Sequence, residues 1–265
     1  MEVLGYSERG VIGSLFYEMR ERKTPELVAE FLSLASFPYR DVAFDVRSAK
    51  VFIDQSFSQF GTPDALLLLE NGGIKQAIFI EAKVKTGGKA LWSVVKEFDA
   101  FRKGVEEVKV SSSNLFTQLY HKVRLVKALQ AGGIERLENG VCFPQASSKR
   151  KRRIGRNKVV RRATCQLLSY AGDALFIALV PEDTENLKTL FQDTLKSYQL
   201  ESFPKWETRS WGYLTWRQVE DFCRAHHLPE TVKVFEFNEG QIYLKQSRRD
   251  QSARALFREG RAHGR

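Results

Sequence analysis

Residues 63–83 read PDALLLLENGGIKQAIFIEAK. Two apolar runs flank Asn71-Gly72-Gly73, whose residues tolerate the positive φ angles that tight hairpin turns require. Apolar residues occupy both alternating faces of each run, a pattern typical of strands buried on both sides in a layered α/β domain. The stretch therefore predicts a β-hairpin at the centre of an α/β fold.

Three charged residues mark one end of this hairpin. Asp64 precedes the first run, Glu81 lies near the end of the second, and Lys83 shares the face of Glu81 because strand side chains alternate. A two-residue turn at Gly72-Gly73 places Asp64 opposite Glu81, and a turn at Asn71-Gly72 makes them diagonal neighbours on one face. A three-residue turn would put Glu81 on the other face unless a bulge intervened. Two of the three simple registers therefore gather all three groups.

An aspartate, a glutamate and a lysine on one sheet face suit the hydrolysis of a phosphodiester. Mg²⁺ prefers oxygen ligands, which Asp64, Glu81 and the backbone carbonyl of Ala82 would supply, and Mn²⁺ is expected to substitute. The metal polarises the scissile phosphate, while Lys83 assists the attacking water and offsets charge on the phosphate. The alternative is a sheet edge that carries solvated charges, and we favour the metal site.

Pro63-Asp64, a spacer of sixteen residues and Glu81-Ala82-Lys83 resemble the signature of the PD-(D/E)XK nuclease superfamily. This superfamily includes restriction endonucleases, Holliday-junction resolvases and RecB-type nucleases, and the resemblance covers residues 7 to about 181. It implies an α/β fold with a restriction-endonuclease-like core, in which a central mixed β-sheet is flanked by helices. Its core order is helix, three-stranded meander, helix, strand.

The segments upstream of the hairpin fit this order. Ser7 is the predicted N-cap of a helix over residues 8–19, and a second helix follows Pro25. Residues 42–54 predict the first strand region of the meander. The resemblance implies a glutamate on the first helix near the metal, for which Glu8 is the candidate; the alternative is an ordinary solvated carboxylate.

Downstream, residues 111–114 predict the cap of a helix over residues 115–129, which Gly132-Gly133 ends. Gln118 and Lys122 are four residues apart and can point the same way. The resemblance implies that such a residue faces the metal and the phosphate, so Gln118 is a catalytic candidate. A solvated helix flank is the alternative, and it is favoured for Lys122.

The remaining segments predict a buried strand at 174–180, helix at 182–200, a short strand at 213–216 and a helix at 218–226. Residues 86–110 depart from the simple core and predict an inserted helix beside the active face. The apolar residues of this inserted helix that fall on one face are Trp92, Val95, Phe98, Phe101 and Val105.

The net charge of +10 is concentrated in two segments. Residues 149–162 contain no acid, so a basic loop at about 145–165 is predicted to be disordered until a polyanion binds it. A solvated loop or a localisation signal is the alternative to nucleic-acid binding. Residues 247–265 predict a basic, disordered tail. The nine basic residues of the loop are Lys149, Arg150, Lys151, Arg152, Arg153, Arg156, Lys158, Arg161 and Arg162.

A chain of 265 residues can hold one large α/β domain with additions or two small ones. The resemblance implies one nuclease-like domain, which we place over residues 1–246, and no apolar run is long enough for a membrane span. Three widely separated cysteines offer no disulfide framework, which favours a cytoplasmic protein. The sequence as a whole predicts a magnesium-dependent endo- or exonuclease that binds DNA rather than RNA. A non-cleaving nucleic-acid-binding protein, or an adaptor in a defence, repair or transposition complex, is the alternative, and self-association or a partner subunit stays open.

Overall fold

The computed structural model describes residues 4–84, 92–106, 111–142, 151–181, 184–195 and 210–242. Two residues of the predicted basic loop, Lys149 and Arg150, and the predicted tail at 247–265 lie outside these ranges. The helices of the described chain are α1 Ser7–Arg22, α2 Pro25–Ser33, η1 Ser58–Phe60, α3 Val94–Glu106, α4 Leu115–Asn139, α5 Lys158–Leu168, α6 Thr184–Thr189, the π-helical η2 Leu190–Thr194, α8 Trp216–Ala225 and α9 Pro229–Ile242. The strands are β1 Val46–Ile53, β2 Ala65–Asn71, β3 Ile74–Ala82, β4 Val141–Cys142, β5 Lys151–Arg152, β6 Asp173–Val180 and β7 Trp211–Thr215.

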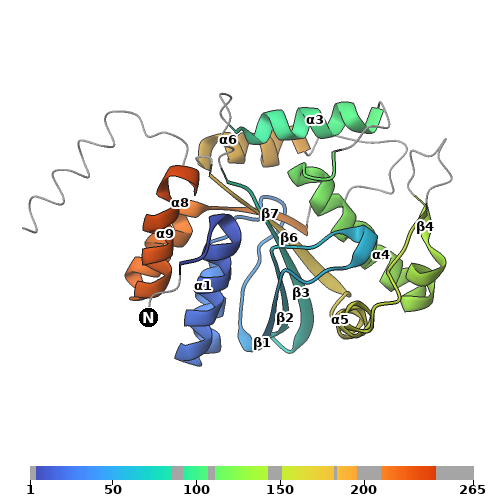
Figure 1. Ribbon diagram of the computed structural model, residues 1–265, viewed down its shortest axis with the longest axis horizontal. Helices are drawn as coiled ribbons and strands as arrows, with labels where there is room; N and C mark the ends of the chain where they lie inside the picture. Colours follow the sequence, from blue (N-terminus) through green and yellow to red (C-terminus); the bar gives the residue numbers. More distant parts are fainter. Residues whose placement is uncertain are drawn as a thin grey trace, which may run out of the picture.

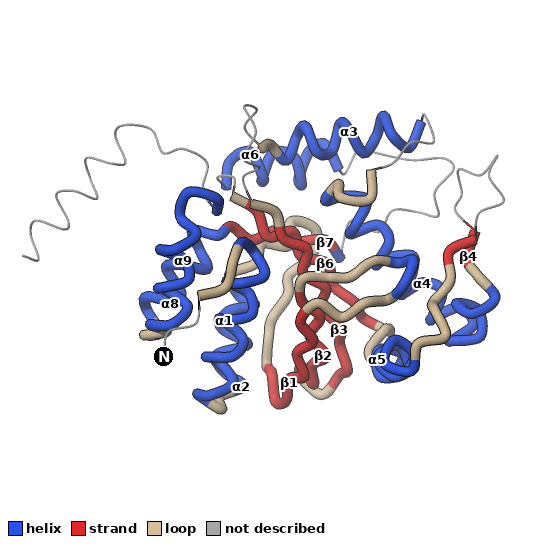
Figure 2. Tube along the Cα trace, in the orientation of Figure 1, coloured by secondary structure: helices blue, strands red, loops and turns tan. Residues whose placement is uncertain are grey.

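A five-stranded mixed sheet in the order β1-β2-β3-β6-β7 forms the middle layer. The first three strands are an antiparallel meander, and β6 and β7 add in parallel to β3. Helices α1, α2, α8 and α9 cover one face, and α4 covers the other with α3, α5 and α6 around it (Figures 1 and 2). The α/β class and the mixed sheet flanked by helices are therefore confirmed.

The turn between β2 and β3 fixes the register of the hairpin. Gly72 and Gly73 have φ angles of 53° and 84°, which a two-residue type I′ turn requires. Asn71 pairs with Ile74, and each earlier residue pairs in step as far as Ala65 with Ile80. One further step places Asp64 opposite Glu81, as the first of the three predicted registers requires.

Both faces of the hairpin are buried, as the continuous apolar runs predicted. Leu66 and Leu68 pack on the α4 side of the sheet, whereas Leu67 and Leu69 pack against α1 and α2. Asp64 lies two residues before Leu66, so the alternation of strand side chains places its carboxylate on the α4 side.

Several sequence predictions need correction. Ser7 is the first helical residue and Tyr6 is the N-cap, which makes no side-chain cap hydrogen bond. The first strand begins at Val46 rather than 42, because residues 42–45 continue the preceding loop. In the inserted helix α3, Val95 is 44% exposed, whereas Phe98 packs edge-on against Phe116 of α4.

The basic segment from Lys151 to Arg162 is not the predicted disordered loop. Lys151 and Arg152 form β5, which pairs with β4, and Lys158, Arg161 and Arg162 lie on α5. Asn157 caps α5 by accepting from the backbone N–H groups of Val159 and Val160. The prediction missed this cap because it weighed the like-charge repulsion and not the apolar face of the helix.

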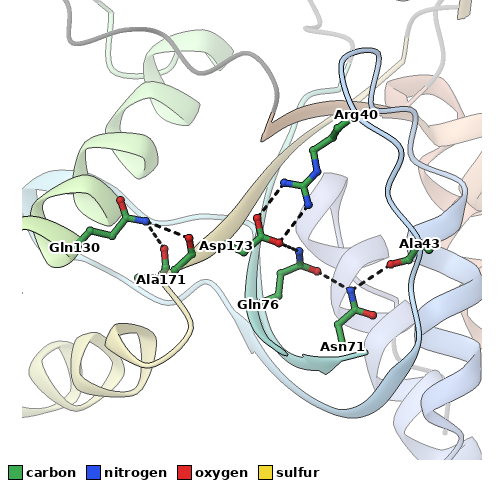
Figure 3. Close-up of polar contacts among 8 residues, drawn as sticks. Arg40, Ala43, Asn71, Gln76, Gln130, Ala171 and Asp173 are labelled. Atoms are coloured by element: carbon green, nitrogen blue, oxygen red, sulfur yellow. Dashed lines mark hydrogen bonds and ion pairs between the residues drawn. The ribbon is translucent and has the colours of Figure 1, made fainter. Parts of the chain in front are cut away.

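A polar network closes the end of the sheet opposite Asp64 and Glu81 (Figure 3). Asp173 accepts two hydrogen bonds from Arg40, at 2.9 and 3.2 Å, and a third from Gln76 at 2.5 Å. Asn71 donates to the side chain of Gln76 and to the carbonyl of Ala43. The network ties the loop before β1 to the starts of β3 and β6.

Gln76→Leu should destabilise the fold by about 1–3 kcal/mol, because it removes the hydrogen bond to Asp173 and leaves the buried Asn71 amide with the Ala43 carbonyl as its remaining acceptor. Urea denaturation checks this, with exposed Lys75→Gln on the same strand as the control. Equal free energies of unfolding for the two variants would show that the network adds no stability.

Candidate active site

The Asp64 carboxylate is buried at the start of β2, with 9% of the residue exposed. Its Oδ2 accepts a hydrogen bond from the backbone N–H of Ala82 at 2.7 Å, which ties the start of β2 to the end of β3. Burial, followed by the negative charge of Glu81, raises the pKa of Asp64 to about 7, while the Ala82 N–H and Lys83 act in the opposite direction. The group can therefore change protonation state near neutral pH.

Glu81 is completely buried on the same face of the sheet. Its Oε1 lies 2.7 Å from Nζ of Lys122, a residue of α4 that is 1% exposed. Its Oε2 has no hydrogen-bond partner among the described residues. Burial raises the pKa of Glu81, and the charges of Lys122 and Lys83 oppose that shift. A buried carboxylate with one unpaired oxygen is suited to a cation.

Lys122 reaches Glu81 because the loop before Asp64 leaves room for it. A Cβ added to Gly61 would lie 3.0 Å from the Lys122 ammonium, and Gly61 also has a φ of 86°. Buried Phe57 and Phe60 anchor this loop, and the N–H of Phe57 donates to the carbonyl of Gly61 at 2.9 Å. The loop therefore sets both the path to Asp64 and the position of the Lys122 ammonium.

The backbone of Lys83 is fixed beyond the end of β3. Its N–H donates to Leu179 of β6 at 2.8 Å, and its carbonyl accepts from the indole N–H of Trp216 at 2.7 Å. The Lys83 ammonium donates to Oε1 of Gln118 on α4 at 2.5 Å. Gln118 and Lys122 therefore present one turn of α4 to Lys83 and Glu81, as their spacing predicted.

Glu8 lies in the first turn of α1 and accepts a short hydrogen bond from the Ser7 hydroxyl. Its negative charge contributes to the raised pKa of Asp64, which places it within electrostatic reach of the site. The structure thus brings Asp64, Glu81, Lys83 and Gln118 together directly and leaves Glu8 at the margin.

The basic residues join the site through the loop before Asp64. The Arg152 guanidinium donates to the carbonyl of Gln59, and the Arg153 N–H donates to the Gln59 side chain at 2.8 Å. The N–H of Gly155 donates to the Ser58 hydroxyl at 2.7 Å. Further away, Arg161 of α5 forms an exposed ion pair with Glu138 at 2.9 Å. Within the described ranges, no ion pair ties Arg156, Lys158 or Arg162 to the site.

Sequence reasoning ranked Lys122 too low and did not single out Gly61 or Trp216. The four-residue spacing from Gln118 was the available signal for Lys122. The roles of Gly61 and Trp216 depend on contacts between segments far apart in sequence, and no local pattern carries that information.

The two buried carboxylates fit a hard divalent cation, because they supply oxygen ligands and one oxygen is unpaired. In the described part of the chain, no group of three or more His, Cys, Asp and Glu side chains is placed to hold a metal. Any cation here would therefore complete its shell with backbone carbonyls, water or substrate oxygens.

None of the described helices is long and apolar enough to cross a membrane.

No protein-family model, curated protein or solved structure matches the chain. The site geometry therefore has to carry the functional argument.

Lys122→Met should destabilise the protein by about 3–5 kcal/mol at pH 8, because it leaves the Glu81 carboxylate buried without its cation. Glu81→Gln combined with Lys122→Met should recover most of that loss, because both charges are then absent. Urea denaturation of the two single variants and the double variant measures the coupling. Additive effects would show that the two side chains do not stabilise one another.

Asp64→Asn should stabilise the metal-free protein at pH 8 by roughly 2–4 kcal/mol and have little effect near pH 4. The folded protein holds a proton on Asp64 up to about pH 7, whereas the unfolded chain releases it near the ordinary pKa of 3.8. Wild-type stability should therefore fall as pH rises through this window, and asparagine removes that dependence.

Urea denaturation in EDTA at pH 4 and pH 8 tests this effect. Exposed Asp221→Asn is the matched control, since Asp221 lies on α8 across the sheet. A stability difference between Asp64→Asn and wild type that does not change with pH would contradict the assignment.

Proposed function

We propose that the chain is a metal-dependent nuclease with a restriction-endonuclease-like core, which hydrolyses phosphodiester bonds in DNA. The observation that carries the proposal is the meeting of Asp64, Glu81 and Lys83 on the α4 face of one hairpin. The chain order of α1, the β1–β2–β3 meander, α4 and β6 supports it, since the superfamily core has the same order.

The carboxylates of Asp64 and Glu81 would hold the cation, which when bound supplies Lewis-acid charge at the scissile phosphate. The Lys122 ammonium favours the carboxylate form of Glu81 and so opposes the burial that raises the pKa of this residue. The hydrogen bond from the Ala82 N–H likewise opposes the raised pKa of Asp64 and orients its carboxylate.

Lys83 is the residue best placed to act on the water and the phosphate. Its backbone is held from both sides, by Leu179 and Trp216, so the side chain starts from a fixed point. Gln118 accepts a hydrogen bond from its ammonium and thereby orients the positive charge. A preorganised cation of this kind stabilises negative charge that develops on the phosphate during attack.

The basic segment beside the site supports a nucleic acid as the substrate, and DNA is the one we propose. Arg152 and Arg153, next to Lys151, contact Gln59 in the loop that leads into Asp64. Phosphate contacts by such basic residues provide affinity without sequence specificity. Arg156 and the basic residues of α5, Lys158, Arg161 and Arg162, would extend this surface.

A non-cleaving nucleic-acid-binding or adaptor protein is the second candidate. The observation that favours it is the ion pair of Glu81 with Lys122, which already compensates the charge of one carboxylate. In that case the same residues would stabilise the fold and the basic segment would carry the function.

Asp64→Asn and Lys83→Met should each reduce cleavage at least about 100-fold, the scale observed when a preorganised charged group is removed from an active site. The assay incubates linear, circular and single-stranded DNA, and RNA, with Mg²⁺, Mn²⁺ or EDTA. Lys83→Met should still bind DNA, because Lys83 acts on the reaction rather than on affinity.

Glu70→Gln and Lys75→Met are the controls, since both change exposed residues of the same hairpin. Cleavage by folded Asp64→Asn at the wild-type rate would exclude this site. DNA binding without cleavage by the wild-type protein under any metal condition would favour the second candidate.

A further inference from the structure

A cavity of about 520 Å³ lies where the second half of α4 meets the β4–β5 hairpin. Three cationic residues line it, Arg124, Arg136 and Lys151, against the single carboxylate of Glu135. The cavity therefore has an excess of positive charge and is open enough to admit a phosphate group.

Glycines shape this cavity. Gly132 and Gly133 have non-helical backbone angles and kink α4, so its last turns leave the axis of the first part. A Cβ at Gly140 would lie 2.8 Å from Cβ of Lys151 and 2.9 Å from Nε of Arg153. Only glycine allows β5 to approach the end of α4 this closely, and that approach brings Lys151 to the cavity.

Among the residues that line the cavity, Glu135 supplies one negative charge against the three positive charges. Neither Arg136 nor Lys151 forms an ion pair with a side chain in the described ranges, and the nearby acid Glu138 is paired with Arg161 of α5. Both side chains are exposed, so they are available to a ligand.

Further cations connect the cavity to the candidate active site. Arg124 follows Lys122 by two residues on α4, so its side chain leaves the helix on the side away from Glu81. His121, buried beside them, has its pKa lowered to about 3 by burial and by the charges of Arg152, Lys122 and Arg124. Arg152 in turn contacts Gln59, in the loop that leads to Asp64. Arg124, which lines the cavity, and Arg152, which contacts the loop before Asp64, thus both lie within electrostatic reach of His121.

We propose that this cavity binds a phosphate group, with Arg136 and Lys151 as its main ligands and Arg124 at its inner wall. Within the proposed nuclease function, on which this assignment rests, the ligand is a backbone phosphate of the DNA strand at a distance from the scissile bond. The cavity would thereby fix the direction in which the strand enters the site.

The test compares Arg136→Gln/Lys151→Gln with the charge-preserving Arg136→Lys/Lys151→Arg. A matched control, Arg217→Gln/Lys233→Gln, removes one arginine and one lysine from the helices on the opposite face of the sheet. All are made in the Asp64→Asn protein, so that DNA binding is measured without cleavage, over several salt concentrations.

The glutamine pair should weaken duplex binding about 10- to 100-fold at low salt and make the slope of log affinity against log salt shallower by one to two units. The charge-preserving pair and the control should bind with the parental slope. Inorganic phosphate should raise the thermal midpoint of the parent above that in chloride of equal ionic strength, and should not do so for the glutamine pair.

Unchanged DNA binding and an unchanged phosphate effect in the glutamine pair would overturn the proposal. If the glutamine pair no longer gains thermal stability from inorganic phosphate but binds DNA as before, the ligand is free phosphate. That outcome would overturn the assignment of the cavity to a DNA backbone phosphate. Cleavage by the otherwise wild-type protein is measured separately. If it is absent while the glutamine pair loses DNA affinity, the nuclease proposal fails and the phosphate site stands.

Discussion

The burial of two carboxylates at the end of one hairpin is the constraint on which the rest of the site depends. Asp64 and Glu81 lie side by side on the α4 face of the sheet, where Glu81 is fully buried and only 9% of Asp64 is exposed. Such groups cost stability unless hydrogen bonds or cations compensate them. The Ala82 N–H compensates Asp64 in part, and Lys122 compensates Glu81. Compensation is incomplete, as the raised pKa of Asp64 and the unpaired Oε2 of Glu81 indicate.

Several distant segments serve this arrangement. The glycine turn at Gly72-Gly73 sets the register, and the loop at Gly61 makes room for Lys122. Trp216, from the last third of the chain, holds the carbonyl of Lys83. Arg152 of β5 and the adjacent Arg153 donate hydrogen bonds to Gln59, in the loop that leads to Asp64. The two hydrophobic layers on the faces of the sheet thus hold the polar groups of the site in position.

The sequence predicted what local geometry controls. The turn residues Asn71-Gly72-Gly73 left three registers open, two of which gather the charged groups, and the positive φ angles of Gly72 and Gly73 show that the register pairing Asp64 with Glu81 is the one formed. The spacing of Gln118 and Lys122 likewise predicted a shared face. The contact of Lys122 with Glu81 could not be predicted, because it depends on how α4 docks on the sheet. The sequence analysis also predicted a disordered basic loop where the structure has β5 and α5. The packing of α5 against α4 outweighs the repulsion between the charges of the segment.

The most direct test of the central claim is a crystal structure of the protein soaked in Mn²⁺, with anomalous scattering used to locate the metal. The account predicts an anomalous peak with carboxylate oxygens of both Asp64 and Glu81 about 2 Å away, as hard divalent cations bind oxygen ligands. A map with no peak there, and with Lys122 still paired to Glu81 in saturating Mn²⁺, would contradict a metal-dependent role for these carboxylates.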